Sequence, residues 1–154
     1  MSLLNYILRS RRIWLAYAHH LTASTEIYGL NHPQKREDYF RLYSQDIVLY
    51  GYEGVGPGLD PVKQFYRRFW NAFPDGSVTA LETVEQADTL VVRHVTTGTQ
   101  AREFMGVPAT GQRIELPGMS ILHFREGRCF ERWTYSDSLL LLRQIGAFPI
   151  RNNS

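Results

Sequence analysis

The chain has 154 residues, which is enough for one domain with a hydrophobic core of its own. Its 17 basic and 15 acidic residues leave a net charge of +2, too small to indicate a nucleic-acid-binding surface. The single cysteine, Cys129, excludes a disulfide framework and a Cys-rich metal site, and it fits a protein of the reducing cytoplasm. No apolar run approaches the ~20 residues that cross a bilayer, so we expect no stable membrane insertion.

Residues 1–30 predict a helical extension to this single domain. Apolar residues recur there at helical spacing, at Leu4, Ile7, Leu8, Leu15 and Ala18. Such a face most often packs on its own domain, and a helix on a membrane surface is the alternative.

A strand is expected around Ile47 to Tyr52, followed by a helix that opens at Asp60-Pro61. Aspartate is a good N-cap and proline suits the first helical position. The apolar residues of this helix then share one face, namely Val62, Phe65, Phe69 and Phe73.

Residues 77–136 predict two β-hairpins. Glu126 resists the positive φ of a two-residue turn, so a three-residue loop with Gly127 in that conformation is expected in the second hairpin. Residues of like parity then share a face. One face carries Ser120, Leu122, Arg132 and Thr134, and the other carries Met119, Ile121, His123, Trp133, Tyr135 and Asp137.

Asp137 lies between an aromatic strand and the apolar run "SLLLLRQIG". It is either a catalytic carboxylate or the N-cap of a helix from Ser138 to Ile145. A short acceptor at that position satisfies free N–H groups and meets the positive end of the helix dipole. We therefore favour the structural role.

Three stretches of the second half resemble the SnoaL-like polyketide cyclase family: "GTQAREFMGVPATGQ", "FREGRCFERW" and "DSLLLLRQIG". The likeness extends over residues 38–149. It implies an α+β fold, in which a cone-shaped, curved antiparallel sheet wraps around N-terminal helices and a short C-terminal helix closes the chain. It also implies a homodimer, a hydrophobic small-molecule ligand in the cone, and aldol chemistry without a metal or organic cofactor.

The resemblance breaks at the residues that carry the family's chemistry. The catalytic carboxylate of the characterised cyclases corresponds to Thr134, and the histidine facing it corresponds to Ser120. A second family histidine corresponds to Gln100. A threonine hydroxyl cannot act as a base near pH 7.

The sequence therefore favours a protein that binds an apolar or aromatic small molecule without the usual acid/base pair. The predicted ligand-binding residues are Phe69, Gln100, Phe104, Ser120, Arg132 and Thr134. The alternative is an active cyclase, isomerase or hydrolase with a relocated acid or base, for which the candidates are His94, Glu131 and Asp137. For His94 the competing interpretation is a hydrogen-bonded, partly buried side chain, and for Glu131 it is a salt bridge to an arginine.

Overall fold

The computed structural model describes residues 31–148 of the chain. The N-terminal helical extension predicted for residues 1–30 lies outside the described residues. The elements in chain order are η1 (Pro33–Leu42), β1 (Tyr43–Tyr50), α2 (Leu59–Ala72), β2 (Ser77–Gln86), β3 (Thr89–Thr99), β4 (Arg113–Arg125), β5 (Arg128–Ser136) and α3 (Ser138–Gln144).

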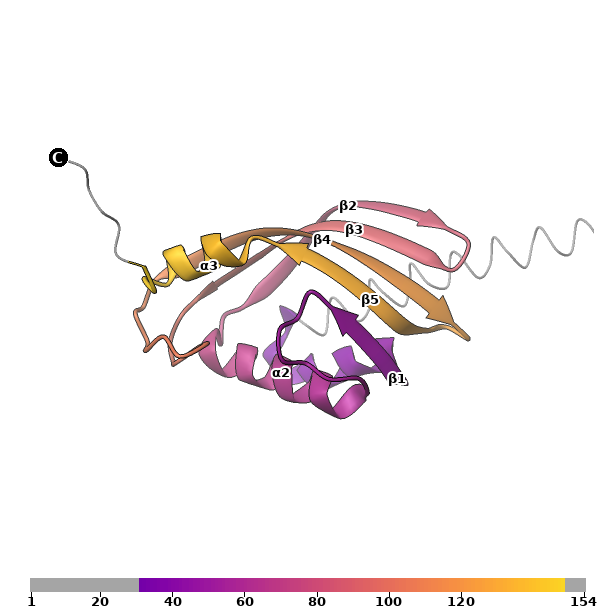
Figure 1. The fold of residues 1–154 in the computed structure, drawn as a ribbon, viewed down its shortest axis with the longest axis horizontal. Helices are drawn as coiled ribbons and strands as arrows, with labels where there is room; N and C mark the ends of the chain where they lie inside the picture. The colour runs from indigo at the N-terminus through magenta and orange to yellow at the C-terminus, as the bar shows by residue number, and fades with distance from the viewer. Residues whose placement is uncertain (1–30, 149–154) are drawn as a thin grey trace, which may run out of the picture.

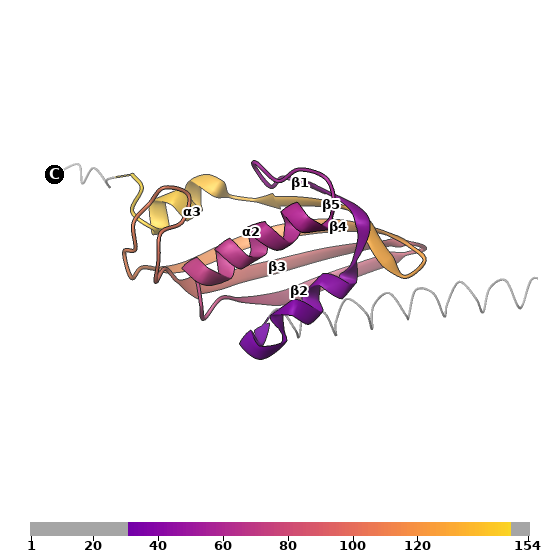
Figure 2. The same ribbon diagram turned by 90° about the horizontal axis from the view of Figure 1, so that it is seen from below.

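The five strands form one sheet in the order β1-β5-β4-β3-β2. β1 pairs with β5 in parallel, and the other neighbours are antiparallel. Figure 1 shows that the sheet curves over α2 and η1, which lie on the same side of it, while α3 lies at one end. In Figure 2, which views the molecule from below, α2 crosses in front of the central strands. The α+β prediction is confirmed, and the side of the sheet that faces α2 is called the inner face below.

The helix predicted at Asp60-Pro61 is present, with a different cap. α2 begins at Leu59, and Gly58, with a φ of 96°, occupies the N-cap without a side-chain hydrogen bond. Its inner side buries Val62, Tyr66 and Trp70. The expectation that Asp60 caps this helix is therefore wrong, because the chain enters the helix through a glycine one residue before Leu59.

The loop between β4 and β5 corrects a second expectation. Glu126 and Gly127 form a two-residue turn, both with positive φ (52° and 75°), so a three-residue loop is wrong here. The strand register then shifts between His123 and Phe124. This irregularity restores the predicted parity, and the faces of the two strands are as expected.

Two hydrophobic clusters fill the inner side. The first joins η1, α2 and the strands around buried residues such as Leu42, Val62 and Leu122. The second lies where α2, α3 and the segment before β4 meet. It consists of Ala72, Phe73, Phe104, Ile114, Leu141 and Ile145. Phe69 packs against both clusters.

Candidate functional site

Polar side chains gather on the inner face where β4 and β5 pair. Ser120 lies directly opposite Thr134, and Leu122 lies opposite Arg132. All four are buried. The sequence placed them on one face, and the structure confirms this. It also brings the two hydroxyls closer than expected, because the three-residue loop would have offset them by one residue pair.

The Ser120 and Thr134 hydroxyls form a hydrogen-bonded pair, with 2.9 Å between Oγ and Oγ1. His94 extends this pair on the β3 side, since its Nε2 lies 3.2 Å from the Ser120 Oγ. On the other side, Thr134 donates to the phenolic oxygen of Tyr52 over 3.2 Å. A line of hydrogen-bonding groups thus crosses the inner face from β3 to the loop after β1.

Arg132 is the charged centre of this region. Its Nε donates to Thr134 (3.1 Å) and its Nη2 donates to Ser120 (2.9 Å). Its Nη1 faces three phenolic oxygens, those of Tyr39 (2.7 Å), Tyr43 (2.8 Å) and Tyr66 (3.2 Å). We call the six hydroxyl residues around this guanidinium the hydroxyl cluster: Tyr39, Tyr43, Tyr52, Tyr66, Ser120 and Thr134.

The four tyrosines of the hydroxyl cluster were not among the residues that sequence reasoning selected. Tyr39 and Tyr43 come from η1 and the start of β1, and their hydroxyls lie 2.8 Å apart. Tyr66 comes from α2 and lies 3.1 Å from Tyr39 and 3.3 Å from Tyr52. The only local signal was the spacing of Tyr39 and Tyr43, which also suits ordinary helical packing.

The surroundings keep these groups in defined charge states. Burial raises the pKa of Tyr52 and of Tyr66, against the opposing effect of Arg132, so both phenols are neutral at pH 7. Burial, and secondarily the charge of Arg132, lowers the pKa of His94 to about 4. Its imidazole is therefore neutral as well, and the guanidinium is the cationic member of the group.

No carboxylate of residues 31–148 forms an ion pair with Arg132. Its neighbours are hydroxyl dipoles, which solvate a cation without neutralising it. The chemistry available in this arrangement is hydrogen-bond donation and stabilisation of negative charge, with His94 as the one neutral side chain that can accept a proton.

Gln100, Phe69 and Phe104 lie toward the other end of the inner face. The Gln100 amide donates to the Val107 carbonyl (3.0 Å) and accepts from the Thr110 hydroxyl (2.7 Å), so it holds the segment between β3 and β4. The Phe69 and Phe104 rings meet edge to face at a centroid distance of 5.9 Å. The structure therefore does not bring these three residues into the hydroxyl cluster.

Asp137 occupies the N-cap of α3. Its Oδ1 accepts a hydrogen bond from the Leu140 backbone N–H at 2.8 Å, and the side chain is exposed. Gly146, with a φ of 79°, follows the end of the helix. The prediction of a capping role is confirmed. The carboxylate lies at the surface, where it caps the first turn of α3.

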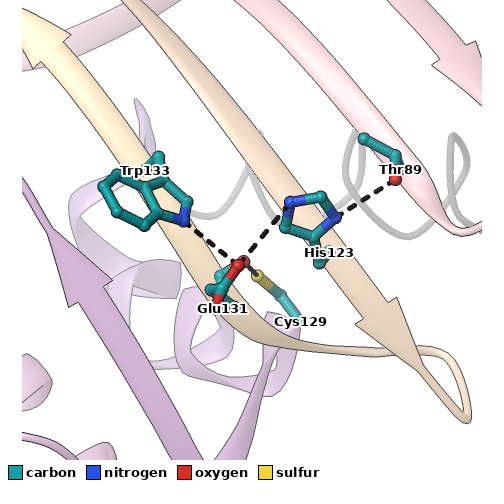
Figure 3. Close-up of polar contacts among 5 residues, drawn as sticks. All are labelled: Thr89, His123, Cys129, Glu131 and Trp133. Carbon is teal, nitrogen blue, oxygen red and sulfur yellow. Dashed lines mark hydrogen bonds and ion pairs between the residues drawn. The ribbon is translucent and has the colours of Figure 1, made fainter.

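Glu131 precedes Arg132 in β5, so their side chains point to opposite faces of the sheet. Figure 3 shows Glu131 between Trp133 and His123. Its Oε1 accepts from the Trp133 Nε1 at 3.1 Å and lies 3.6 Å from the His123 Nε2. The His123 Nδ1 in turn lies 3.1 Å from the Thr89 hydroxyl. The partners of Glu131 are Trp133 and His123, where an arginine was expected. The carboxylate does not reach the hydroxyl cluster.

Within residues 31–148, no three His, Cys, Asp or Glu side chains come together in a way that would hold a metal ion. None of the helices in that part of the chain is long and apolar enough to span a bilayer.

Comparisons with known proteins agree with this architecture. The proposed hydroxylase AclR from Streptomyces galilaeus superposes with a TM-score of 0.75 at 24% identity, over 87% of this chain and 99% of AclR. A proposed SnoaL-like polyketide cyclase from Jannaschia sp. CCS1 gives a TM-score of 0.72 at 22% identity, over 88% and 94% of the two chains. These two matches show the fold.

A further match is nearer in sequence. The proposed polyketide cyclase IdmH from Streptomyces antibioticus is 31% identical, with a TM-score of 0.66, over 80% of this chain and 97% of IdmH. A search of curated proteins gives no match. The sequence model of the SnoaL-like polyketide cyclases matches residues 19–145. The chain therefore belongs to the SnoaL-like polyketide cyclase family.

Proposed function

We propose that this protein binds a small molecule with an apolar or aromatic body on the inner side of its sheet, and that it does so without the family's usual acid/base pair. The observation that carries the proposal is the hydroxyl cluster itself. Ser120 and Thr134 stand at the positions that the resemblance assigns to the histidine and the carboxylate, and they bond to each other at 2.9 Å. Hydroxyls in that arrangement orient a carbonyl or phenol oxygen without removing a proton.

Aromatic side chains beside the cluster support an unsaturated ligand. Tyr52 and Phe65 meet edge to face at 5.1 Å, and both are only partly buried. Phe69 continues this surface toward the second hydrophobic cluster. Apolar walls with a few convergent polar groups are typical of small-molecule sites.

A neutral fluorescent probe, N-phenyl-1-naphthylamine, tests the proposal. We expect saturable enhancement of its fluorescence at one probe per chain. The enhancement should be lost in Thr134→Trp, which fills the space beside the cluster, and kept in Thr89→Trp on the opposite face. Circular dichroism checks that both variants fold. Absence of saturable binding to the wild-type protein would refute the proposed function.

A catalytic alternative rests on the position of His94. Its ring touches the cluster through Ser120, and its Nδ1 has no hydrogen-bond partner among the described residues. A base whose conjugate acid has a pKa of about 4 removes a proton from carbon only weakly at pH 7. Turnover of a polyketide ester that disappears in His94→Gln, with probe binding intact, would favour this alternative over a binding role.

We also propose that the protein is a homodimer of the cytoplasm that pairs through the outer face of the sheet. A row of apolar side chains crosses that face from strand to strand: Tyr50, Trp133, Ile121, Val91 and Val84. The Tyr50 and Trp133 rings stack at 3.9 Å, and beside them Tyr135 is 65% exposed and Met119 is 45% exposed. An exposed apolar surface of this kind is typical of an interface. The cytoplasmic assignment rests on the single cysteine.

A further inference from the structure

The guanidinium of Arg132 carries a positive charge into the interior, and its hydrogen-bond acceptors among residues 31–148 are neutral hydroxyl oxygens. We propose that Arg132 and the hydroxyl cluster form a receptor for an anionic oxygen, a carboxylate or an ionised enol, borne on a planar unsaturated ligand. This inference rests on the proposed function and specifies the chemical class of its ligand.

The first argument concerns charge. Arg132 is 9% exposed, and taking an ion out of water costs several kcal/mol unless an opposite charge or very good hydrogen bonds replace the water. Among residues 31–148 no acidic side chain pairs with it. A ligand anion would provide the missing opposite charge inside the protein, where the low dielectric constant makes the attraction stronger than in water.

The second argument concerns hydrogen bonds. A guanidinium has five N–H groups and no acceptor. The Nη2 of Arg132 contacts only the Ser120 oxygen, so one of its two N–H groups has no acceptor in the described part of the chain. Trp70, whose ring lies 5.7 Å from that of Tyr66, has a buried Nε1–H with no partner there either. Donors thus exceed acceptors, as in a site built for an oxygen anion.

The third argument concerns access. Arg132, Thr134 and His94 retain 9%, 8% and 7% of their surface, whereas Ser120 and Tyr43 retain 1% each. The first three side chains lie on the inner face, the side of the sheet on which the ligand is proposed to bind. The Arg132 guanidinium also lies 5.8 Å from the centre of the Tyr52 ring. A ligand whose anionic oxygen lies at the guanidinium would therefore have its planar body against an aromatic surface.

Two matched pairs of probes test the inference by isothermal titration calorimetry at pH 7. 2-Naphthoate is compared with its neutral methyl ester, and the ionised enol 2-hydroxy-1,4-naphthoquinone with its neutral methyl ether. We expect at least one anion to bind about 10- to 100-fold more tightly than its neutral partner, as a hydrogen bond to a charged group implies. The pair with the larger difference in affinity shows whether the site takes a carboxylate or an ionised enol.

The variant Arg132→Met should reduce this preference to less than about threefold, and Arg132→Lys should keep part of it. Arg93→Met is the matched control, since Arg93 pairs with Glu82 at the surface and its loss should leave the preference unchanged. If Arg132→Met fails to fold, the comparison of the probe pairs in the wild-type protein still decides.

Three outcomes would overturn the inference. Equal binding of both members of each pair would leave the proposed function intact and remove the anion site. Binding of N-phenyl-1-naphthylamine without binding of any of the four probes would do the same, whereas loss of all binding would refute the proposed function itself. Finally, Glu26 is the only acidic residue outside residues 31–148. A tenfold gain in anion affinity in Glu26→Gln would show that the chain supplies its own anion.

Discussion

No carboxylate of residues 31–148 pairs with Arg132, and the effect on stability of an aspartate introduced at position 134 can be worked out from the geometry. The Thr134 Oγ1 lies 3.1 Å from the Arg132 Nε and 2.9 Å from the Ser120 Oγ. A carboxylate oxygen at the same point would accept both hydrogen bonds and face a cation in a buried site. We expect this to lower the pKa of the new aspartate below its usual ~3.9.

A depressed pKa makes the contribution to folding depend on pH. A fall from about 3.9 in the unfolded chain to about 2 in the folded chain contributes about 2.6 kcal/mol. That stability is present above the unfolded pKa and is lost as the pH falls through the folded pKa. Thr134→Asp should therefore exceed the neutral, equally sized Thr134→Asn in unfolding free energy at pH 7, and the difference should shrink below about pH 4.

Urea unfolding followed by circular dichroism measures both variants in the presence and absence of Arg132→Met. Without the guanidinium, the same aspartate becomes an unpaired buried charge, which costs about 3–5 kcal/mol. The double-mutant cycle should return a coupling energy of that order. Equal stability of Thr134→Asp and Thr134→Asn at pH 7, or a coupling energy near zero, would refute the view that Arg132 is an uncompensated cation.

Three further changes test other parts of the structure. Asp137→Ala should lose the hydrogen bond from the Leu140 N–H and about 0.5–2 kcal/mol of stability in thermal unfolding, while Asp137→Asn keeps most of it; lost ligand binding in a stable Asp137→Asn protein would contradict the capping role. Gly51→Ala should unfold at markedly lower denaturant concentration, because an added Cβ would overlap a carbonyl of β5 and φ is +84°; unchanged stability would argue against this strand contact. Met119→Glu, directly opposite Tyr135 on the outer face, should convert a dimer of twice the chain mass into a monomer in light scattering, and a wild-type monomer at all concentrations would reject the dimer.

Much of the inner face could be read from the sequence because strand alternation is a local property. Ser120, Arg132 and Thr134 share a face for the simple reason that side chains alternate along paired strands. The turn at Glu126 was predicted incorrectly, yet one register shift near Phe124 cancelled the error. Parity survived because the two-residue turn and the bulge together move the pairing by two residues relative to the predicted loop, and a shift of two residues keeps every side chain on its face.

The centre of the site could not be read in this way, since it depends on contacts between distant segments. Tyr39 bonds to Arg132 across 93 residues of sequence, and Tyr66 reaches the same atom from α2. No periodicity encodes that convergence. Glu131 shows the converse. Side chains alternate along β5, so the sequence already placed Glu131 on the face of Trp133 and away from Thr134. It was a candidate acid only because its side chain is a carboxylic acid.

The presence of Arg132 also changes what position 134 can do. A general base needs a pKa near the working pH, and a guanidinium 3.1 Å away would hold a carboxylate there in its ionised, weakly basic form. Threonine at this position is consistent with the arginine, because a hydroxyl accepts from the Nε and passes a hydrogen bond on to Tyr52. His94 is subject to the same positive charge, which adds to burial in lowering its pKa to about 4. The whole cluster is thus biased toward donating hydrogen bonds and stabilising negative charge, and away from removing protons.

For that reason Thr134→Asp with Ser120→His should yield no base catalysis on a polyketide ester while Arg132 remains. A gain of turnover is expected only when Arg132 is replaced by a neutral residue as well. Turnover in the double variant with Arg132 intact, measured by product formation over the wild-type background, would show that the guanidinium does not control the charge of this site.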